Sequence, residues 1–182
     1  MLRLLKPDAC YPSLYEVDLD GLSRKGIRGL ILDLDNTIVE YANASVPDRA
    51  VAWVREALDR GFRVCITSNA VTGRVAAFSE ALGVPGIANA VKPASWPFRR
   101  ALKLLGTAPR ETAVIGDQVF TDVLGGNRLG MFTVLVNPLS TAEMVTTRLV
   151  RLLERRALAY LRRKGLLSDA DWRTREGRRA HG

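Results

Sequence analysis

The sequence has little of the residue that many hydrolytic sites need, since its 182 residues include a single histidine, His181, second from the end. Serine triads, cysteine–histidine dyads, HExxH zinc sites and histidine phosphatases all require a well-placed histidine. The chain has no G-x-x-x-x-G-K-[ST] phosphate loop and no Cys-x5-Arg motif, because Glu16 and Val71 stand six residues after Cys10 and Cys65. If the protein is an enzyme, carboxylates must carry the chemistry.

Cysteine and long apolar runs are also scarce. Two cysteines cannot build a disulfide framework, and they favour a reducing compartment. No apolar run reaches the roughly 18 residues of a membrane-spanning helix, and the first residues lack the apolar segment of a signal peptide. With 47% hydrophobic and 25% charged residues, the composition is that of one globular domain with an appendage. We therefore expect a cytoplasmic protein.

Positive charge is concentrated near the end of the chain. Residues 1–147 carry 16 lysines and arginines against 15 acidic residues, whereas residues 148–182 carry 11 against 4. The body is therefore nearly neutral, and the tail has a net charge of +7. This asymmetry indicates an anionic partner, a membrane surface or nucleic acid, unless the tail is simply solvated.

Short apolar runs alternate with amphipathic segments over residues 27–138. Runs of this length suit buried parallel strands, and apolar residues at helical spacing suit the helices between them. The expected strands are 27–33, 62–67, 87–91, 112–115 and 132–136, and the expected helices are 47–60, 72–82, 96–105 with Ser95 as its cap, and 119–129. This order predicts an α/β fold, a doubly wound, parallel, five-stranded sheet with helices on both faces.

The two ends of the chain lie outside this alternation. We interpret residues 1–26 as a packing extension of a domain that covers residues 1–139, and residues 140–182 as a basic helical extension with a disordered tail. One helical face there collects Val145, Leu149, Leu152, Leu153, Ala157 and Tyr160, beside a stripe of Arg148, Arg151, Arg155 and Arg162. Such a helix is typical of peripheral contact with an anionic membrane, here through residues 145–164. The alternative is a helix packed on the core with a solvated basic edge.

Polar residues gather where the expected strands end. The carboxyl ends of parallel strands meet at one edge of the sheet, and ligands bind there. Four acids at one edge would raise each other's pKa, so the cluster needs cations, which a lysine and a bound Mg²⁺ can supply. The residues are Asp33 and Asp35 after the first strand, Ser68 and Asn69 after the second, Lys92 after the third, and Asp117 and Asp122 after the fourth.

Taken singly, these segments have ordinary explanations, because DLDNT at 33–37 suits a turn and Ser68 suits a helix cap. Together with Lys92-Pro93 and GDQVFTD at 116–122, in this order, they resemble the haloacid dehalogenase superfamily of phosphohydrolases. The similarity is greatest to its small class III phosphatases, the YqeG family, which in turn resemble mitochondrial phosphatidylglycerophosphate phosphatases. Leu5-Lys6-Pro7, Lys25-Gly26-Ile27 and Asn137-Pro138 also fit this family.

The resemblance implies a Rossmann-like fold without a cap domain, and it implies which acids react. Asp33 would be the nucleophile that forms an aspartyl-phosphate. Asp35 would protonate the leaving oxygen and then activate the attacking water. The side chains of Asp33 and Asp117, with the backbone carbonyl of Asp35, would bind Mg²⁺.

The resemblance also implies how the phosphate is held. Ser68 and the N–H of Asn69 would bind phosphoryl oxygens, and Lys92 would neutralise developing negative charge. Asp122 would hold Lys92 or the water shell of the metal. This division agrees with the chemistry, since phosphoryl transfer depends mainly on positioning and charge stabilisation.

The motif spacing leaves no room for a cap domain within 37–47 or 69–92. An uncovered site suits a terminal phosphate on a lipid, a protein or a nucleic acid. The resemblance implies phosphatidylglycerophosphate, a substrate of phospholipid biosynthesis, and a location that is cytoplasmic or peripheral on the inner membrane face. The alternatives are a phosphatase of another large or soluble phosphomonoester, and a non-enzymatic protein that binds nucleic acid or the ribosome through its basic tail.

Overall fold

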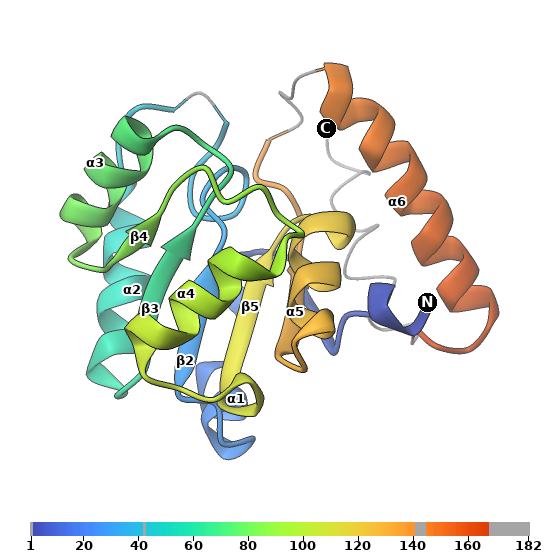
Figure 1. Cartoon of the computed structure of the whole chain (residues 1–182), viewed down its shortest axis with the longest axis horizontal. Coiled ribbons are helices and arrows are strands. Elements are labelled where there is room, and N and C mark those ends of the chain that lie inside the picture. The colour runs from blue at the N-terminus through green and yellow to red at the C-terminus, as the bar shows by residue number, and fades with distance from the viewer. Residues whose placement is uncertain (1, 42, 141–144, 168–182) are drawn as a thin grey trace.

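Six parallel strands form one sheet in the order β1-β6-β5-β2-β3-β4 (Figure 1). The computed structural model describes residues 2–41, 43–140 and 145–167. The strands are β1 (Ala9–Tyr11), β2 (Gly29–Leu32), β3 (Arg63–Thr67), β4 (Gly86–Ile87), β5 (Thr112–Gly116) and β6 (Phe132–Val136). Every pairing between them is parallel, so the predicted α/β class is confirmed.

Helices connect the strands and cover both faces of the sheet (Figure 1). They are α1 (Leu19–Arg24), α2 (Asp48–Asp59), α3 (Thr72–Leu82), α4 (Ser95–Leu105), α5 (Leu124–Arg128) and α6 (Val145–Arg163). Shorter turns are η1 (Leu2–Leu5), η2 (Leu14–Glu16), η3 (Pro109–Glu111) and the π-helical η4 (Val119–Val123). Helices α3 and α4 end at Gly83 and Gly106, whose φ angles of 66° and 60° are left-handed and favour glycine.

The prediction of five strands is wrong by one, because the leader contributes β1. Only three residues of β1 pair with β6, with Ala9 opposite Val134, and three residues are too few to show a periodic pattern. Asp8 anchors the strand, since its N–H donates to the Thr133 carbonyl at 2.9 Å and its carboxylate accepts from the Thr133 N–H at 2.8 Å. The leader therefore widens the sheet.

Three element boundaries also differ from the expected ones. The strand expected over 87–91 ends at Ile87, because Asn89 and Val91 have left-handed φ angles of 48° and 51° that a strand does not contain. Ala94 rather than Ser95 is the cap of α4. The helix expected over 119–129 is divided into η4 and α5.

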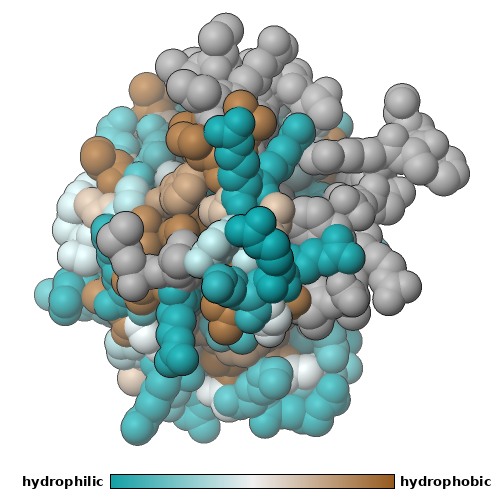
Figure 2. Space-filling model, turned by 90° about the vertical axis from the view of Figure 1, so that its right-hand side faces the viewer, coloured by the Kyte–Doolittle hydropathy of each residue, from teal (hydrophilic) through white to brown (hydrophobic). Residues whose placement is uncertain are grey.

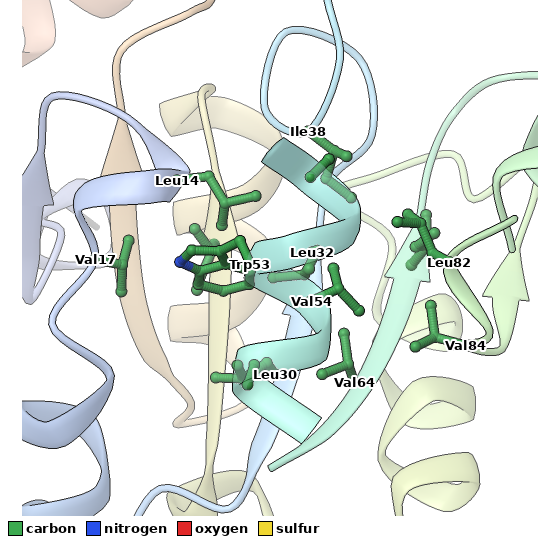
Figure 3. Packing of buried hydrophobic residues seen from close by; sticks show 14 of the residues in the cluster. Leu14, Val17, Leu30, Leu32, Ile38, Trp53, Val54, Val64, Leu82 and Val84 are labelled. Atoms are coloured by element: carbon green, nitrogen blue, oxygen red, sulfur yellow. The ribbon is translucent and has the colours of Figure 1, made fainter. Parts of the chain in front are cut away.

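Alternate residues of each strand face opposite sides of the sheet. Leu30 and Leu32 of β2 face the side that α1, α2 and α3 cover, where Trp53 of α2 packs near them (Figure 3). Ile31, between the two leucines, faces the other side and packs in a cluster with Phe98 of α4. Because both faces are covered, the strands carry continuous apolar runs rather than an alternating pattern.

Helix α6 packs on the second face through one strip of side chains. Leu158 and Leu161 are 2% and 0% exposed, in a cluster with Val119 of η4. The apolar stripe expected from the sequence is not this strip, because its members Leu152 and Leu153 are 44% and 47% exposed. The helix therefore meets the core with one face and leaves a second apolar stripe on the surface.

The structure describes the expected C-terminal extension in part. The side chains of residues 145–149 and 151, and the expected disordered tail at 168–182, lie outside the described residues. The domain boundary after residue 139 stays a prediction. Within the described ranges, no helix has both the length and the hydropathy of a membrane span.

The strand order reverses at β2, which places the functional edge. After β2 the chain runs outward to β3 and β4, and it then crosses to β5 on the other side of β2. In sheets of this kind ligands bind beyond the carboxyl ends of the strands, at the switch point. The residues that follow β2, β3 and β5 are therefore the first candidates for a site.

Candidate active site

A buried ammonium group lies between two carboxylates at this edge. Lys92 Nζ lies 2.6 Å from Oδ1 of Asp33 and 2.6 Å from Oδ1 of Asp122. The side chains of Asp33, Asp117 and Asp122 each offer an oxygen within 4.8 Å of the others, and all three residues are buried. The structure thus brings four of the seven residues expected from the sequence into one cluster.

The local backbone explains how these three carboxylates come together. Asp33 extends β2 by one residue, and its N–H donates to the Ile115 carbonyl of β5 at 2.9 Å. Asp117 directly follows β5, and η4 then turns Asp122 back toward the strand end. A Cβ atom on Gly116 would lie 2.3 Å from Cγ of Asp122. Glycine at 116 is therefore required for Asp122 to approach Lys92.

Burial and charge shift the pKa values of the cluster in a consistent way. Burial raises the pKa of Asp33 from 3.8 to about 8; Lys92 opposes this shift, and Asp122 and Asp117 reinforce it. Burial acts to lower the pKa of Lys92, but the Asp122 and Asp33 carboxylates outweigh it and raise that pKa above its ordinary value. Lys92 is therefore charged at neutral pH, and Asp33 gains a proton unless another cation is near.

The residues present fit a divalent cation. Three buried carboxylates around one ammonium leave an excess of negative charge when all are ionised. Carboxylate oxygens are the ligands that hard cations such as Mg²⁺ prefer. Because Asp122 is engaged by Lys92, Asp33 and Asp117 are the side chains best placed to hold such an ion.

Asp35 does not join this cluster. Its Oδ1 accepts hydrogen bonds from Nε (3.0 Å) and Nη2 (2.8 Å) of Arg74 in α3. Asn36 follows in a left-handed conformation (φ 63°) that asparagine tolerates, so the chain reverses immediately after Asp35. Arg74 also donates to the Asn43 carbonyl at 2.6 Å. One guanidinium therefore fixes both Asp35 and the loop that follows it.

Ser68 and Asn69 directly follow β3, and Asn69 contacts the loop between β4 and α4 that carries Lys92. Ser68 is 1% exposed, and its Oγ accepts from the Ala70 N–H at 3.0 Å. Asn69 Oδ1 accepts from the Lys92 N–H at 2.9 Å. The asparagine side chain therefore fixes the backbone of Lys92.

Sequence reasoning did not identify Arg74 or the steric role of Gly116. Arg74 lies in the first turn of the helix that follows Ser68 and Asn69, and this position was the only available signal. Gly116 stands directly before Asp117, but only the fold places the Asp122 side chain against it.

Comparison with known proteins places the chain in a family. A family model described as "HAD-hyrolase-like" matches residues 89–143, which include Lys92, Asp117 and Asp122. The probable phosphatase YqeG of Bacillus subtilis is 40% identical over 163 residues, which cover 90% of this chain and 95% of that protein. The fold and the site thus define a hydrolase of the haloacid dehalogenase superfamily. The chain belongs to the YqeG family of phosphatases within it.

Two further proteins are similar to this chain. Phosphatidylglycerophosphate phosphatase 1 of Arabidopsis thaliana is 30% identical over 90% of this chain, which spans half the length of that protein. The 3-deoxy-D-manno-octulosonate 8-phosphate phosphatase of Yersinia pestis has 18% sequence identity and a TM-score of 0.51, over 79% of this chain and 89% of that one. The second likeness concerns the fold alone.

Proposed function

We propose that the protein is a Mg²⁺-dependent phosphomonoesterase that acts through an aspartyl-phosphate on Asp33, with phosphatidylglycerophosphate as its substrate. The observation that carries the proposal is the buried pairing of Lys92 with Asp33 and Asp122 beside Asp117. A binding protein has no need to keep three carboxylates and an ammonium out of water, because desolvating charges costs free energy. A phosphoryl-transfer site uses such charges for catalysis.

In the first half of the reaction the phosphoryl group moves to Asp33. A carboxylate oxygen of Asp33 attacks phosphorus, and the ester P–O bond to the leaving alkoxide breaks. Asp35 gives its proton to that alkoxide as general acid. Both contacts from Arg74 use Oδ1 of Asp35, so proton transfer falls to Oδ2.

In the second half, water releases phosphate. Asp35, now ionised, takes a proton from a water molecule whose oxygen attacks phosphorus, and the bond from phosphorus to Asp33 breaks. Inorganic phosphate leaves, and both aspartates return to their starting states. Asp35 therefore acts as acid and then as base, which requires that it stay near the reacting oxygens without joining the metal-binding carboxylates.

The remaining residues hold charge and position. Mg²⁺, bound by Asp33, Asp117 and the carbonyl of Asp35, would neutralise phosphoryl oxygens and keep Asp33 ionised. Lys92 offsets the charge that develops on the transferred group, and Asp122 keeps its ammonium in place. Ser68 and the N–H of Asn69 would bind the other phosphoryl oxygens.

The substrate proposal rests on how little chain is available to cover the site. Residues 33–47 connect β2 to α2, and only α3 lies between β3 and β4. We infer a site without a cap domain, which suits a phosphate carried by a large molecule or an interface. The name of the Arabidopsis relative supports phosphatidylglycerophosphate as that molecule.

The surface of α6 supports a peripheral position at an anionic membrane. Exposed Leu152 and Leu153 lie on a helix that also exposes Arg155, Arg156 and Arg162. Figure 2 faces the side of the molecule that carries α6, and it shows hydrophobic side chains (brown) between long hydrophilic ones (teal). Residues 145–164 would thus contact the inner membrane face through exposed leucines and arginines.

The test is phosphate release with and without Mg²⁺ from three substrates: phosphatidylglycerophosphate in anionic micelles, glycerol 3-phosphate and an aryl phosphate. We expect strong preference for the lipid and no activity in Asp33→Asn. Turnover of the aryl phosphate alone would retain the chemistry and replace the lipid by another phosphomonoester. Inactivity on all three, with salt-dependent RNA binding that is lost on removing residues 148–182, would favour the nucleic-acid alternative.

A further inference from the structure

Exposed apolar side chains occur on three loops that flank the site. The structure describes eight large hydrophobic side chains as exposed, namely Tyr41, Leu58, Val71, Val91, Trp96, Leu104, Leu152 and Leu153. Tyr41 lies on the loop after β2, Val71 on the loop after β3 and Val91 on the loop after β4. Each of these loops also carries at least one of the site residues expected from the sequence.

Hydrogen bonds connect the three loops to one another. Arg74 Nη1 donates to the Asn43 carbonyl at 2.6 Å, which ties the first loop to the start of α3. The Asn89 N–H donates to the Ala70 carbonyl at 3.0 Å, which ties the third loop to the second. In Figure 1 all three loops lie at the top of the molecule, beyond the arrowheads of the strands. We call Tyr41, Val71 and Val91 the apolar rim.

Val91 is the most unusual member of the apolar rim. It is 68% exposed, so folding hides little of its surface, yet its φ angle of 51° lies in the left-handed region. A β-branched residue in this region is strained, and such strain is concentrated at functional sites. Glycine or asparagine would fit this backbone at lower free-energy cost. An exposed valine there is best explained by something outside the chain that contacts it.

We propose that the apolar rim enters the interfacial layer of a phospholipid bilayer, so that the site faces head groups directly. The proposal rests on the proposed function only in that the phosphomonoester comes from the same bilayer. Tyrosine is amphipathic and suits the head-group level, whereas valine suits the acyl boundary. Inserted this way, the rim would present Asp33 and Lys92 to a phosphate that projects from the membrane.

The charges of the rim loops favour a bilayer over a nucleic acid. Residues 36–47, 69–74 and 89–96 contain three charged residues, Glu40, Arg74 and Lys92, and Lys92 is buried. Nucleic-acid binding depends on many exposed cations that face phosphates, and these loops do not supply them. The exposed Arg128 lies beside the rim instead, with its Nη1 3.5 Å from the Pro93 carbonyl, whereas the charge of Arg74 is paired with Asp35. An apolar centre with an exposed arginine beside it is complementary to an anionic lipid surface.

The test compares two double variants that each remove two exposed apolar side chains. Tyr41→Ser/Val71→Ser changes the apolar rim, and Leu58→Ser/Leu104→Ser changes the C-terminal ends of α2 and α4, where Leu58 and Leu104 are 40% and 52% exposed. Those helix ends lie at the opposite edge of the sheet, because the helices run antiparallel to the strands (Figure 1). Each variant and the wild type are sedimented with vesicles of phosphatidylcholine and phosphatidylglycerol, and each is assayed on a soluble aryl phosphate. Circular dichroism checks that each variant is folded.

We expect the rim variant to lose about tenfold in vesicle partitioning, or about 1.4 kcal/mol, while the control variant partitions like the wild type. Both variants should keep wild-type kcat/KM on the aryl phosphate. The inference is overturned if the rim variant partitions like the wild type, if the control loses as much, or if the rim variant loses binding to a single-stranded RNA rather than to vesicles. Failure of the wild type to hydrolyse any phosphomonoester would contradict the proposed function. The sedimentation of the three proteins would still show whether the apolar rim binds the bilayer.

Discussion

The carboxylate of Glu154 in α6 accepts a hydrogen bond from the Phe120 N–H in η4, at 3.1 Å. Glu154 is only 1% exposed, so a buried acid of the basic C-terminal helix binds the turn that carries Asp122. Val119 and Val123 of the same turn are fully buried in the cluster that contains Leu158. Helix α6 therefore packs against η4, the turn that carries Asp122 of the site.

Replacing Leu158 by alanine should show how strongly α6 is held. Leu158 is 2% exposed, and the loss of a buried leucine costs about 2–5 kcal/mol. Leu152→Ala is the matched control, because Leu152 is on the same helix and 44% exposed, and it should change stability by less than about 0.5 kcal/mol. The measurement is the free energy of unfolding in urea. Equal stability of the two variants would mean that α6 is not docked as described.

Adding one methyl group at Gly116 should disturb the site. The new Cβ would lie 2.3 Å from Cγ of Asp122, whose side chain is buried and hydrogen bonded to Lys92. We expect Gly116→Ala to lower the free energy of unfolding by about 1–3 kcal/mol and to lower kcat, because Asp122 must move. Gly73→Ala is the control, since nothing lies within 4 Å of its Cβ position in α3. A Gly116→Ala enzyme with wild-type kcat would refute this account of Asp122.

Arg74 should affect kcat by orienting Asp35, and it should have little effect on the free energy of unfolding. The pair is 22% exposed on each side, and a partly exposed ion pair contributes no more than about 1 kcal/mol. We expect Arg74→Ala to lower kcat about tenfold or more, as Asp35 loses its orientation, and Arg74→Lys to recover only part, since lysine cannot make both contacts. Full kcat in Arg74→Ala would exclude the positioning role.

The raised pKa of Asp33 predicts that stability falls as the pH rises, and that Mg²⁺ opposes this loss. Its pKa of about 8 in the fold exceeds the ordinary 3.8, so the folded protein binds this proton more tightly than the unfolded chain does. Without metal, proton binding by Asp33 contributes fully to stability below about pH 3.8, the ordinary pKa. This contribution is lost as the pH rises through about 8, the pKa in the fold. Mg²⁺ should stabilise the protein more at high pH, where it competes with fewer protons.

The measurement for this prediction is the melting temperature from pH 5 to about 9, with and without Mg²⁺, for the wild type and Asp33→Asn. The wild type without metal should lose more stability with rising pH than the variant does. Mg²⁺ should raise the wild-type melting temperature most at alkaline pH. Parallel curves for the two proteins would show that Asp33 does not bind the proton or the metal.

Much of the fold follows from the alternation of apolar runs and amphipathic segments. The α2 and α3 boundaries agree closely with the expected ones, because Gly61 and Gly83 end these patterns. Strand β1 could not be foreseen, since a three-residue edge strand is specified by its partner β6 rather than by its own sequence. The packed face of α6 could not be foreseen for a similar reason: helical periodicity offers two apolar stripes, and only tertiary contact selects Leu158.

The grouping of Asp33, Lys92, Asp117 and Asp122 could be foreseen because parallel strands end at one edge. The chemical roles of these residues stay proposals. The separate position of Asp35 depends on a left-handed Asn36 and on Arg74, which lies 39 residues away in the sequence. Spacing alone cannot show which of two neighbouring carboxylates a distant guanidinium binds.

The most direct test of the central claim is to identify the residue that carries phosphate during turnover. Wild-type protein, Asp35→Asn and Asp33→Asn would be mixed with Mg²⁺ and a ³²P-labelled aryl phosphate, quenched in acid and digested for peptide mass spectrometry. We predict an acyl phosphate on Asp33 that accumulates in Asp35→Asn, because an aryl leaving group departs without a general acid whereas hydrolysis of the intermediate still needs Asp35 as base, and that is absent in Asp33→Asn. Turnover by Asp33→Asn at the wild-type rate, or label on any other residue, would contradict the mechanism.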